Sequence, residues 1–183
     1  MAFTHPIVTL ALGAPFYRRE VSGWIWLWGA ILTALPDIDF IGYRMGIPYS
    51  HLMGHRGFTH SLFFAATAAL LSTFYFRERW KSNLTGLWLF FFLCTASHGL
   101  LDGMTNGGLG VAFFSPFETS RYFLPWRPIP VAPLSPRLIF SAWGEQVIAS
   151  ELVWIWLPTL LTAAVIFGAR WSRLRNRDSD SVR

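Results

Sequence analysis

A heptapeptide just before a long apolar run concentrates side chains that can do chemistry. It holds two imidazoles and a guanidinium, in a chain with five histidines. Imidazole nitrogens bind transition metals and exchange protons near neutral pH. His55 and His60 are five positions apart, which does not place them on one helix face. They converge if the chain turns at Gly57, and Thr59 or Ser61 can then cap the following helix.

Further imidazoles and carboxylates lie at the ends of other apolar runs. His98 and Asp102 are four residues apart, so on a helix they share a face. This spacing is typical of a hydrogen-bonded helix end, and it also suits two metal ligands, or one ligand and the residue that orients it. Asp37 and Asp39 form either a helix exit with a turn or a carboxylate pair for a cation, and His5 opens the first run. Imidazole and carboxylate ligands suit Zn²⁺, and also Mn²⁺ or Fe²⁺. Seven groups exceed one tetrahedral site, so we expect one or two ions.

The composition assigns these groups to an integral membrane protein. The chain has 183 residues, of which 53% are hydrophobic and 17% aromatic. Only 14% are charged, against about 25% in soluble domains. The net charge of +5 does not indicate nucleic acid, because the basic residues cluster at the ends of apolar runs. No cleavable signal peptide is expected, and the single Cys94 forms no intramolecular disulfide.

Five apolar runs must position the chemistry. The first is too short to cross a bilayer core that needs about 20 helical residues. We therefore predict an all-α, polytopic membrane helix bundle of about four spanning helices plus a short N-terminal helix. Its single domain covers residues 1–170, and the basic tail 171–183 is expected to be disordered. The second run should stop at Pro36, and Pro158 should kink the last. The runs are 4–16, 21–35, 58–76, 84–101 and 152–169.

The distribution of basic residues predicts the orientation. One set of inter-run segments holds ten Lys and Arg, and the longer opposite set holds five. The positive-inside rule makes the first side cytoplasmic, with the C-terminus inside. All seven candidate ligands then fall at the outer face. Ionisable groups at membrane depth are costly unless paired or functional, which favours a metal site over coincidence.

Three of these motifs resemble the bacterial family of inner-membrane-associated metal-dependent hydrolases, also described as LexA-binding. They are Leu35–Asp39, Gly54–Ser61 and Ser97–Thr105, and the likeness covers about residues 1–130. The resemblance implies a bacterial inner membrane location. It also implies that His5, Asp37, Asp39, His55, His60, His98 and Asp102 form the metal-binding set. The mixture of His and Asp is similar in kind to zinc-dependent phospholipases C. No sequence feature indicates binding to a repressor or to DNA.

These observations predict a metal-dependent hydrolase that acts on an ester or phosphodiester of a lipid-like or phosphate-containing substrate. Asp37 or Asp39, whichever does not bind metal, is the candidate general base. Arg56 is either a fork for an anionic substrate group or an interfacial anchor. The glycine-rich loop after Asp102 offers N–H groups to an oxyanion or is merely a turn. The aromatic clusters at 113–117 and 122–126 form an interfacial belt or line a lipid-accessible entrance.

Two other classes of function are compatible with a bundle that carries these side chains. A non-catalytic metal-binding membrane protein, such as a transporter, a sensor or a structural element, would use the same ligands. A haem-binding bundle is the third hypothesis. Haem would call for histidine pairs deep in spanning helices, whereas His55, His60 and His98 lie near helix ends.

Overall fold

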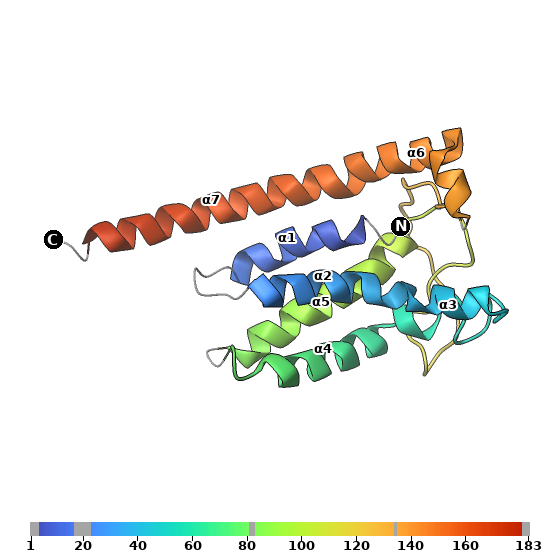
Figure 1. Cartoon of the computed structure of the whole chain (residues 1–183), viewed down its shortest axis with the longest axis horizontal. Coiled ribbons are helices and arrows are strands. Elements are labelled where there is room, and N and C mark those ends of the chain that lie inside the picture. The colour runs from blue at the N-terminus through green and yellow to red at the C-terminus, as the bar shows by residue number, and fades with distance from the viewer. Residues whose placement is uncertain (1–3, 17–22, 81–82, 134, 181–183) are drawn as a thin grey trace.

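Helices make up the fold of this chain. The computed structural model describes residues 4–16, 23–80, 83–133 and 135–180. Within these residues the regular elements are all helical, and two isolated β-bridges are the only sheet-like pairings. The chain is therefore an all-α membrane helix bundle, as its composition predicts. The main helices run roughly along the long axis of the molecule (Figure 1).

The first half of the chain forms a short helix and a longer, segmented one. The turns η1 (His5–Ile7) and η2 (Ala14–Phe16) flank α1 (Val8–Gly13). Helix α2 (Gly23–Ala34) passes through the 3₁₀ turn η3 (Leu35–Ile38) into α3 (Asp39–Arg44). The α-helix of the second run thus ends just before Pro36, as predicted, but the helical path continues beyond it as a 3₁₀ turn. Proline ends the α-helical bonding, but it starts a 3₁₀ turn well, because its N–H is not needed there.

The third run is shorter as a helix than its sequence suggests. Phe58–His60 form the 3₁₀ turn η4, and α4 spans Leu62–Phe76. The Ser61 side chain caps α4 by accepting a hydrogen bond from the N–H of Phe64 at 3.0 Å. The 15-residue α4 is therefore an apolar helix below the usual spanning length.

Three helical stretches are long and apolar enough to cross a membrane. They are Gly23–Arg44, Leu84–Gly103 (which is α5) and Ala142–Arg173. The last follows the turn η5 (Pro136–Phe140) and comprises α6 (Ala142–Glu151), the π-helical turn η6 (Leu152–Trp156) and the part of α7 (Leu157–Asp180) up to Arg173. The π turn ends two residues before Pro158, the position at which a kink was predicted. Helix α7 continues to Asp180, so most of the tail expected to be disordered is helical.

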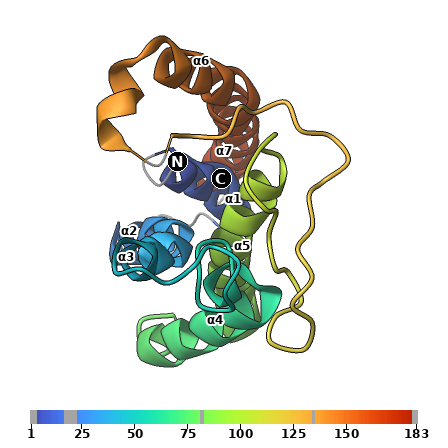
Figure 2. The same ribbon diagram turned by 90° about the vertical axis from the view of Figure 1, so that its right-hand side faces the viewer.

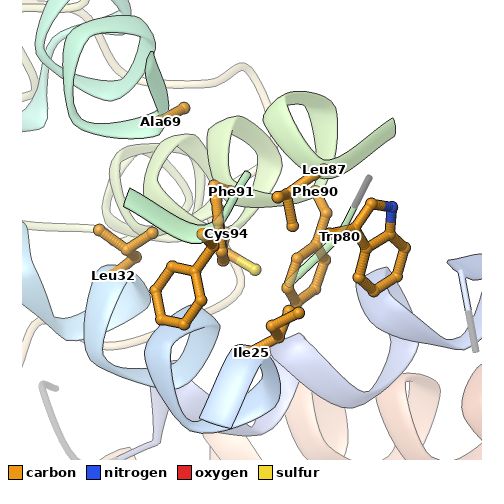
Figure 3. Close-up of a cluster of buried hydrophobic side chains, with 9 residues drawn as sticks. Ile25, Leu32, Ala69, Trp80, Leu87, Phe90, Phe91 and Cys94 are labelled. Carbon is orange, nitrogen blue, oxygen red and sulfur yellow. The ribbon is translucent and has the colours of Figure 1, made fainter. Parts of the chain in front are cut away.

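Helix α5 packs at the centre of the bundle, between α2 and α4. Aromatic and aliphatic side chains from these helices fill the space between them (Figure 3). Phe91 and Leu87 of α5 are fully buried, against Ile25 and Leu32 of α2 and Phe76 of α4. Lipid chains are as apolar as these side chains, so close packing stabilises such an interface more than the hydrophobic effect does.

The segment between α5 and η5 runs as an extended loop along one side of the bundle (Figure 2). This loop, the connection after α3 and the end of α5 lie at the same end of the molecule. The C-terminus of α7 lies at the opposite end (Figure 1). One end of the bundle thus gathers the loops that carry the candidate site residues.

Candidate metal centre

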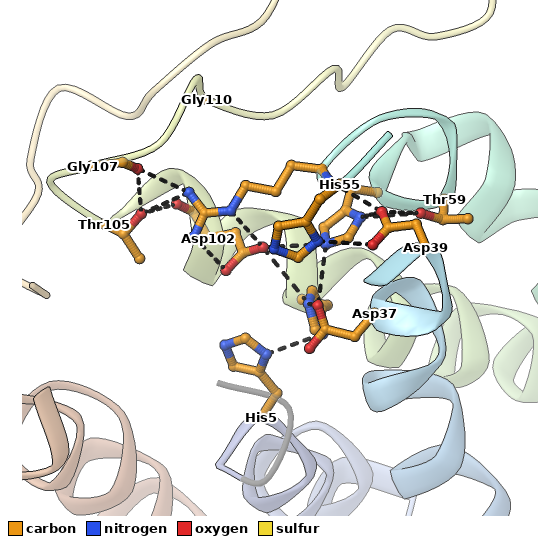
Figure 4. A network of polar contacts seen from close by, with 12 residues as sticks. His5, Asp37, Asp39, His55, Thr59, Asp102, Thr105, Gly107 and Gly110 are labelled. Carbon is orange, nitrogen blue, oxygen red and sulfur yellow. Dashed lines mark hydrogen bonds and ion pairs between the residues drawn. The ribbon is translucent and has the colours of Figure 1, made fainter. Parts of the chain in front are cut away.

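Four segments bring imidazoles and carboxylates together at the loop-rich end of the bundle (Figure 4). Asp37 lies in η3, and Asp39 is the first residue of α3. His60 ends η4, whereas His98 and Asp102 lie one turn apart near the end of α5. Segments separated by up to 65 residues in sequence therefore meet in one cluster.

Four of these side chains face one another and form what we call the inner cluster: Asp37, His60, His98 and Asp102. His60 Nε2 lies 3.2 Å from Asp102 Oδ2 and 3.8 Å from Asp37 Oδ1. His98 Nε2 lies 3.3 Å from Asp37 Oδ1 and 3.7 Å from Asp102 Oδ2. One ligand atom from each side chain lies within 4.8 Å of the others, so the group could hold a metal ion.

The inner cluster holds its buried polar atoms in ion pairs rather than in well-aligned hydrogen bonds. Among the described residues, His60 Nε2, His98 Nε2 and Asp102 Oδ2 contact one another, Asp37 Oδ1 and Arg56 Nε at 3.1–3.8 Å. Two imidazole nitrogens and two carboxylate oxygens that face one another are a donor set that suits a cation such as Zn²⁺.

The remote nitrogens of the two histidines are held by other groups. His60 Nδ1 lies 3.1 Å from Asp39 Oδ2. His98 Nδ1 lies 2.6 Å from the carbonyl oxygen of Thr33. In a 3₁₀ turn that carbonyl would accept a hydrogen bond from the N–H of residue 36, but Pro36 has no N–H. The carbonyl is therefore available to accept from His98. With Nδ1 as the donor, each ring presents a free Nε2 to the inner cluster, the arrangement that metal-binding histidines show in proteins.

Asp39 receives donors from three sides. Its Oδ2 accepts from Thr59 Oγ1 at 2.7 Å and from the backbone N–H of Arg56 at 3.1 Å. Its Oδ1 lies 2.8 Å from His55 Nδ1. Asp39, His55 and His60 form a second group that could hold a metal. Hydrogen bonds already occupy both oxygens of Asp39, however, which suits an orienting role behind His60.

Arg56 holds Asp102 and the following loop. Its Nε and Nη2 each lie 3.1 Å from an oxygen of Asp102. Its Nη1 donates to Thr105 Oγ1 at 2.9 Å and to the carbonyl of Gly107 at 3.1 Å. Arg56 is only 4% exposed, so it is not an interfacial anchor. Its φ of 61° is uncommon for a residue with a side chain, and such backbone is found where the surroundings over-determine it.

Charge in the cluster controls the protonation of His60. Burial by itself lowers the pKa of this imidazole, because it penalises the charged form. Hydrogen bonds and attraction from Asp102 and Asp39 outweigh burial and raise the pKa to about 9. Without a metal, His60 is therefore a cation at neutral pH. A divalent cation would replace that proton among the same carboxylates.

Close backbone contact sets the distance between the two inner histidines. A Cβ atom added at Gly99, next to His98, would lie 2.8 Å from the carbonyl oxygen of His60. Real Cβ atoms essentially never come so close to another heavy atom. The absence of a side chain at Gly99 therefore lets η4 approach α5 and keeps His60 beside His98.

The seven candidate ligands predicted from the sequence divide into three groups. Four form the inner cluster, Asp39 and His55 lie behind His60, and His5 lies beside His98. His5 Nδ1 is 3.0 Å from His98 Nδ1, and the rings meet edge to face. The carbonyl of Thr33 and the hydroxyl of Thr105 were not predicted as site groups, and Thr59 was predicted only as a possible helix cap. No pattern marks a single carbonyl, but Thr59 lies inside the histidine motif.

Comparisons with known proteins agree with the membrane assignment. A family model described as YdjM inner membrane protein matches residues 1–175. Inner membrane protein YbcI of Escherichia coli (strain K12) is 40% identical over 172 residues, which cover 94% of this chain and 97% of that protein. Inner membrane protein YdjM, from E. coli (strain K12) and from Shigella flexneri, is 43% identical over 93 residues, which cover 44% of this chain and 44% of the relative. No solved structure matches. The bacterial inner membrane family that the motifs predicted is confirmed: the chain belongs to the YdjM inner membrane protein family.

Proposed function

We propose that the chain is a membrane-embedded, metal-dependent hydrolase of an ester or phosphodiester in a lipid-like or phosphate-containing substrate. One observation carries the proposal. Three buried ligand atoms, His60 Nε2, His98 Nε2 and Asp102 Oδ2, face one another beside Asp37 at 3.2–3.8 Å. Ionisable groups gathered so closely at membrane depth are costly unless they are paired or functional, and this donor set suits a divalent cation.

In this proposal the inner cluster holds one Zn²⁺, with Mn²⁺ or Fe²⁺ as alternatives of the same ligand preference. When bound, such an ion lowers the pKa of a coordinated water to about 7 and supplies hydroxide at neutral pH. His60 and His98 contribute Nε2, and Asp102 contributes Oδ2. Arg56 keeps Asp102 in place and neutralises part of the charge of the cluster.

The two carboxylates after Pro36 then have different roles. The side chain of Asp37 is 20% exposed, whereas that of Asp39 is 2% exposed. Asp37 can therefore reach a substrate and exchange a proton with it, and we assign it proton transfer. Asp39 acts through His60, as a positioning residue, because its oxygens accept from four donors.

The non-catalytic alternative is favoured by the number of ligands. Four protein groups fill a tetrahedral Zn²⁺ shell, as they do in structural sites. In that case the metal would stabilise the junction of η3, η4 and α5 and leave no position for water. The exposed edge of Asp37 favours the catalytic form, because a carboxylate at an opening can exchange with water.

We further propose that the centre lies at the periplasmic face of the inner membrane, with the C-terminus in the cytoplasm. Arg77 and Arg79 follow the end of α4, and Arg170 and Arg173 lie toward the end of α7, both at the end opposite the inner cluster (Figure 1), which supports this orientation. A reporter fused after residue 183 should read cytoplasmic, and one inserted within 103–150 should read periplasmic. The reverse pattern refutes the orientation but not the centre.

Elemental analysis of protein purified without chelator tests the proposal. Wild type should carry one zinc, manganese or iron per chain, and His60→Ala should carry none. His51→Ala is the matched control, since the side chain of His51 is exposed and accepts a hydrogen bond from the nearby N–H of Met53, and the change keeps the backbone. Hydrolysis of phospholipid vesicles by wild type, lost in His60→Ala, separates the enzyme from a structural site. Wild type without stoichiometric metal refutes both.

A further inference from the structure

Two loop segments cover the candidate centre at the end of the bundle, and we call them the cap: residues 49–57 and 105–124. Arg121 ties the two segments together. Its Nη1 donates to the carbonyl of His55 at 2.9 Å, and its Nη2 donates to the carbonyls of Tyr49 at 2.8 Å and His51 at 3.1 Å. The backbone N–H of Ala112 also donates to the carbonyl of Arg56 at 3.1 Å. The cap is thus a bonded unit between the inner cluster and the end of the molecule.

The inner cluster is more accessible at its side than under the cap. The side chains of His60 and His98 are fully buried, and that of Asp102 is 6% exposed. Asp37, at 20%, is the most exposed of the four. Its neighbours along η3 and α3 are apolar and exposed: Ile38 at 53% and Ile41 at 60%. The open edge of the cluster therefore adjoins an apolar helix surface.

This apolar surface continues the membrane-facing side of a spanning helix. Gly23–Arg44 is a candidate span, and Trp24, Leu27 and Ile31 of α2 are exposed like Ile38 and Ile41. Asp37 lies seven residues before Arg44, or about 10 Å at 1.5 Å per helical residue. With the exposed Arg44 at the headgroup level, Asp37 lies near the boundary between headgroups and acyl chains.

We propose that the centre receives its substrate laterally from the bilayer, as an anionic phospholipid. Its acyl chains would lie along Ile38 and Ile41, its phosphate near Arg44, and its ester region at Asp37. The positive charge of Arg44 complements the lipid phosphate, and the apolar surface is continuous with that of the span. This inference rests on the proposed metal centre and adds the source and class of the substrate. A water-soluble phosphoester would instead have to pass the cap.

The rate at which chelators remove zinc distinguishes access from the bilayer from access through the cap, and it does not require hydrolysis. The zinc-loaded protein is placed in nanodiscs of phosphatidylethanolamine and phosphatidylglycerol and exposed to either of two chelators. EDTA is charged and stays in water, whereas the uncharged tetrakis(2-pyridylmethyl)ethylenediamine enters the bilayer. EDTA should remove zinc at least about tenfold more slowly, which corresponds to a barrier difference of about 1.4 kcal/mol. A soluble zinc protein with an exposed site calibrates the two reagents.

Single substitutions test which residues control access of each chelator to the zinc. Arg121→Ala should raise the rate of removal by EDTA about tenfold, which again corresponds to about 1.4 kcal/mol. Arg137→Ala, at an exposed arginine of η5 outside the cap, should not change it. Ile38→Trp should slow the bilayer-soluble chelator and leave the zinc content unchanged.

Equal rates for both chelators in wild type overturn the lateral route, as does an Ile38→Trp variant with unchanged kinetics. Faster removal by EDTA in Arg137→Ala as well as Arg121→Ala would show that the cap is not the barrier and would also overturn it. Absence of zinc from wild type is a different result, because it refutes the metal centre itself.

Discussion

Asp39→Asn is the sharpest test of how the centre is organised. The change keeps the shape of the side chain and removes its charge, while Asp39→Ala removes all four contacts. If Asp39 only orients His60, the variant should still bind one metal per chain. Loss of a partner that orients a ligand typically weakens metal affinity by about 10–100-fold, or about 1.4–2.8 kcal/mol. Asp39→Ala should weaken binding further, because it leaves Thr59 and the Arg56 N–H without their acceptor.

A competition titration against a chromophoric chelator in detergent measures both the affinity and the stoichiometry. Asp37→Asn is the matched comparison, since it alters the neighbouring carboxylate that faces both inner imidazoles. Because Asp37 is assigned proton transfer rather than metal binding, the change should lower affinity less than Asp39→Asn does and should lower the rate of hydrolysis instead. If wild type binds two ions and Asp39→Asn binds one, then Asp39 and His55 hold a second metal. That result would refute the orienting role.

Three further changes test other parts of the centre. The pKa of about 9 for His60 lies above the ordinary value of 6.5, so protonation stabilises the metal-free fold below pH 6.5, and this stabilisation disappears as pH rises through about 9. Metal competes with that proton, so apparent zinc affinity in chelator-buffered titrations should rise about tenfold per pH unit from 7 to 8.5; a flat profile would contradict a protonated His60. Gly99→Ala should weaken zinc binding by separating His60 from His98, while Gly168→Ala, which has open space around it, should not; equal affinities in both would refute the close-contact argument. Arg56→Ala removes the guanidinium that pairs with the buried Asp102. It should destabilise the metal-free protein by about 3–5 kcal/mol in a detergent unfolding assay. An unchanged unfolding midpoint would show that Asp102 does not depend on Arg56.

The fold class could be predicted from composition, but the lengths of the helices could not. Apolar runs indicate a membrane protein because a bilayer core accepts few other sequences. The start of α4 depended on Ser61 acting as a cap, whereas Thr59 was an equally good candidate from sequence. Thr59 donates to Asp39 instead. Two hydroxyl residues two positions apart are equivalent by local propensity, and only their tertiary partners distinguish them.

The sequence by itself determined which chemical groups the chain gathers and at which helix ends they lie. Residue type and the spacing of His98 and Asp102 are local properties, so they can be read without a fold. Only the tertiary structure decided which atoms face one another. Asp37 and Asp39 look alike in sequence, yet one borders the inner cluster and the other lies behind His60. That division depends on how η3, η4 and α5 are rotated against one another, and packing between segments distant in sequence sets those rotations.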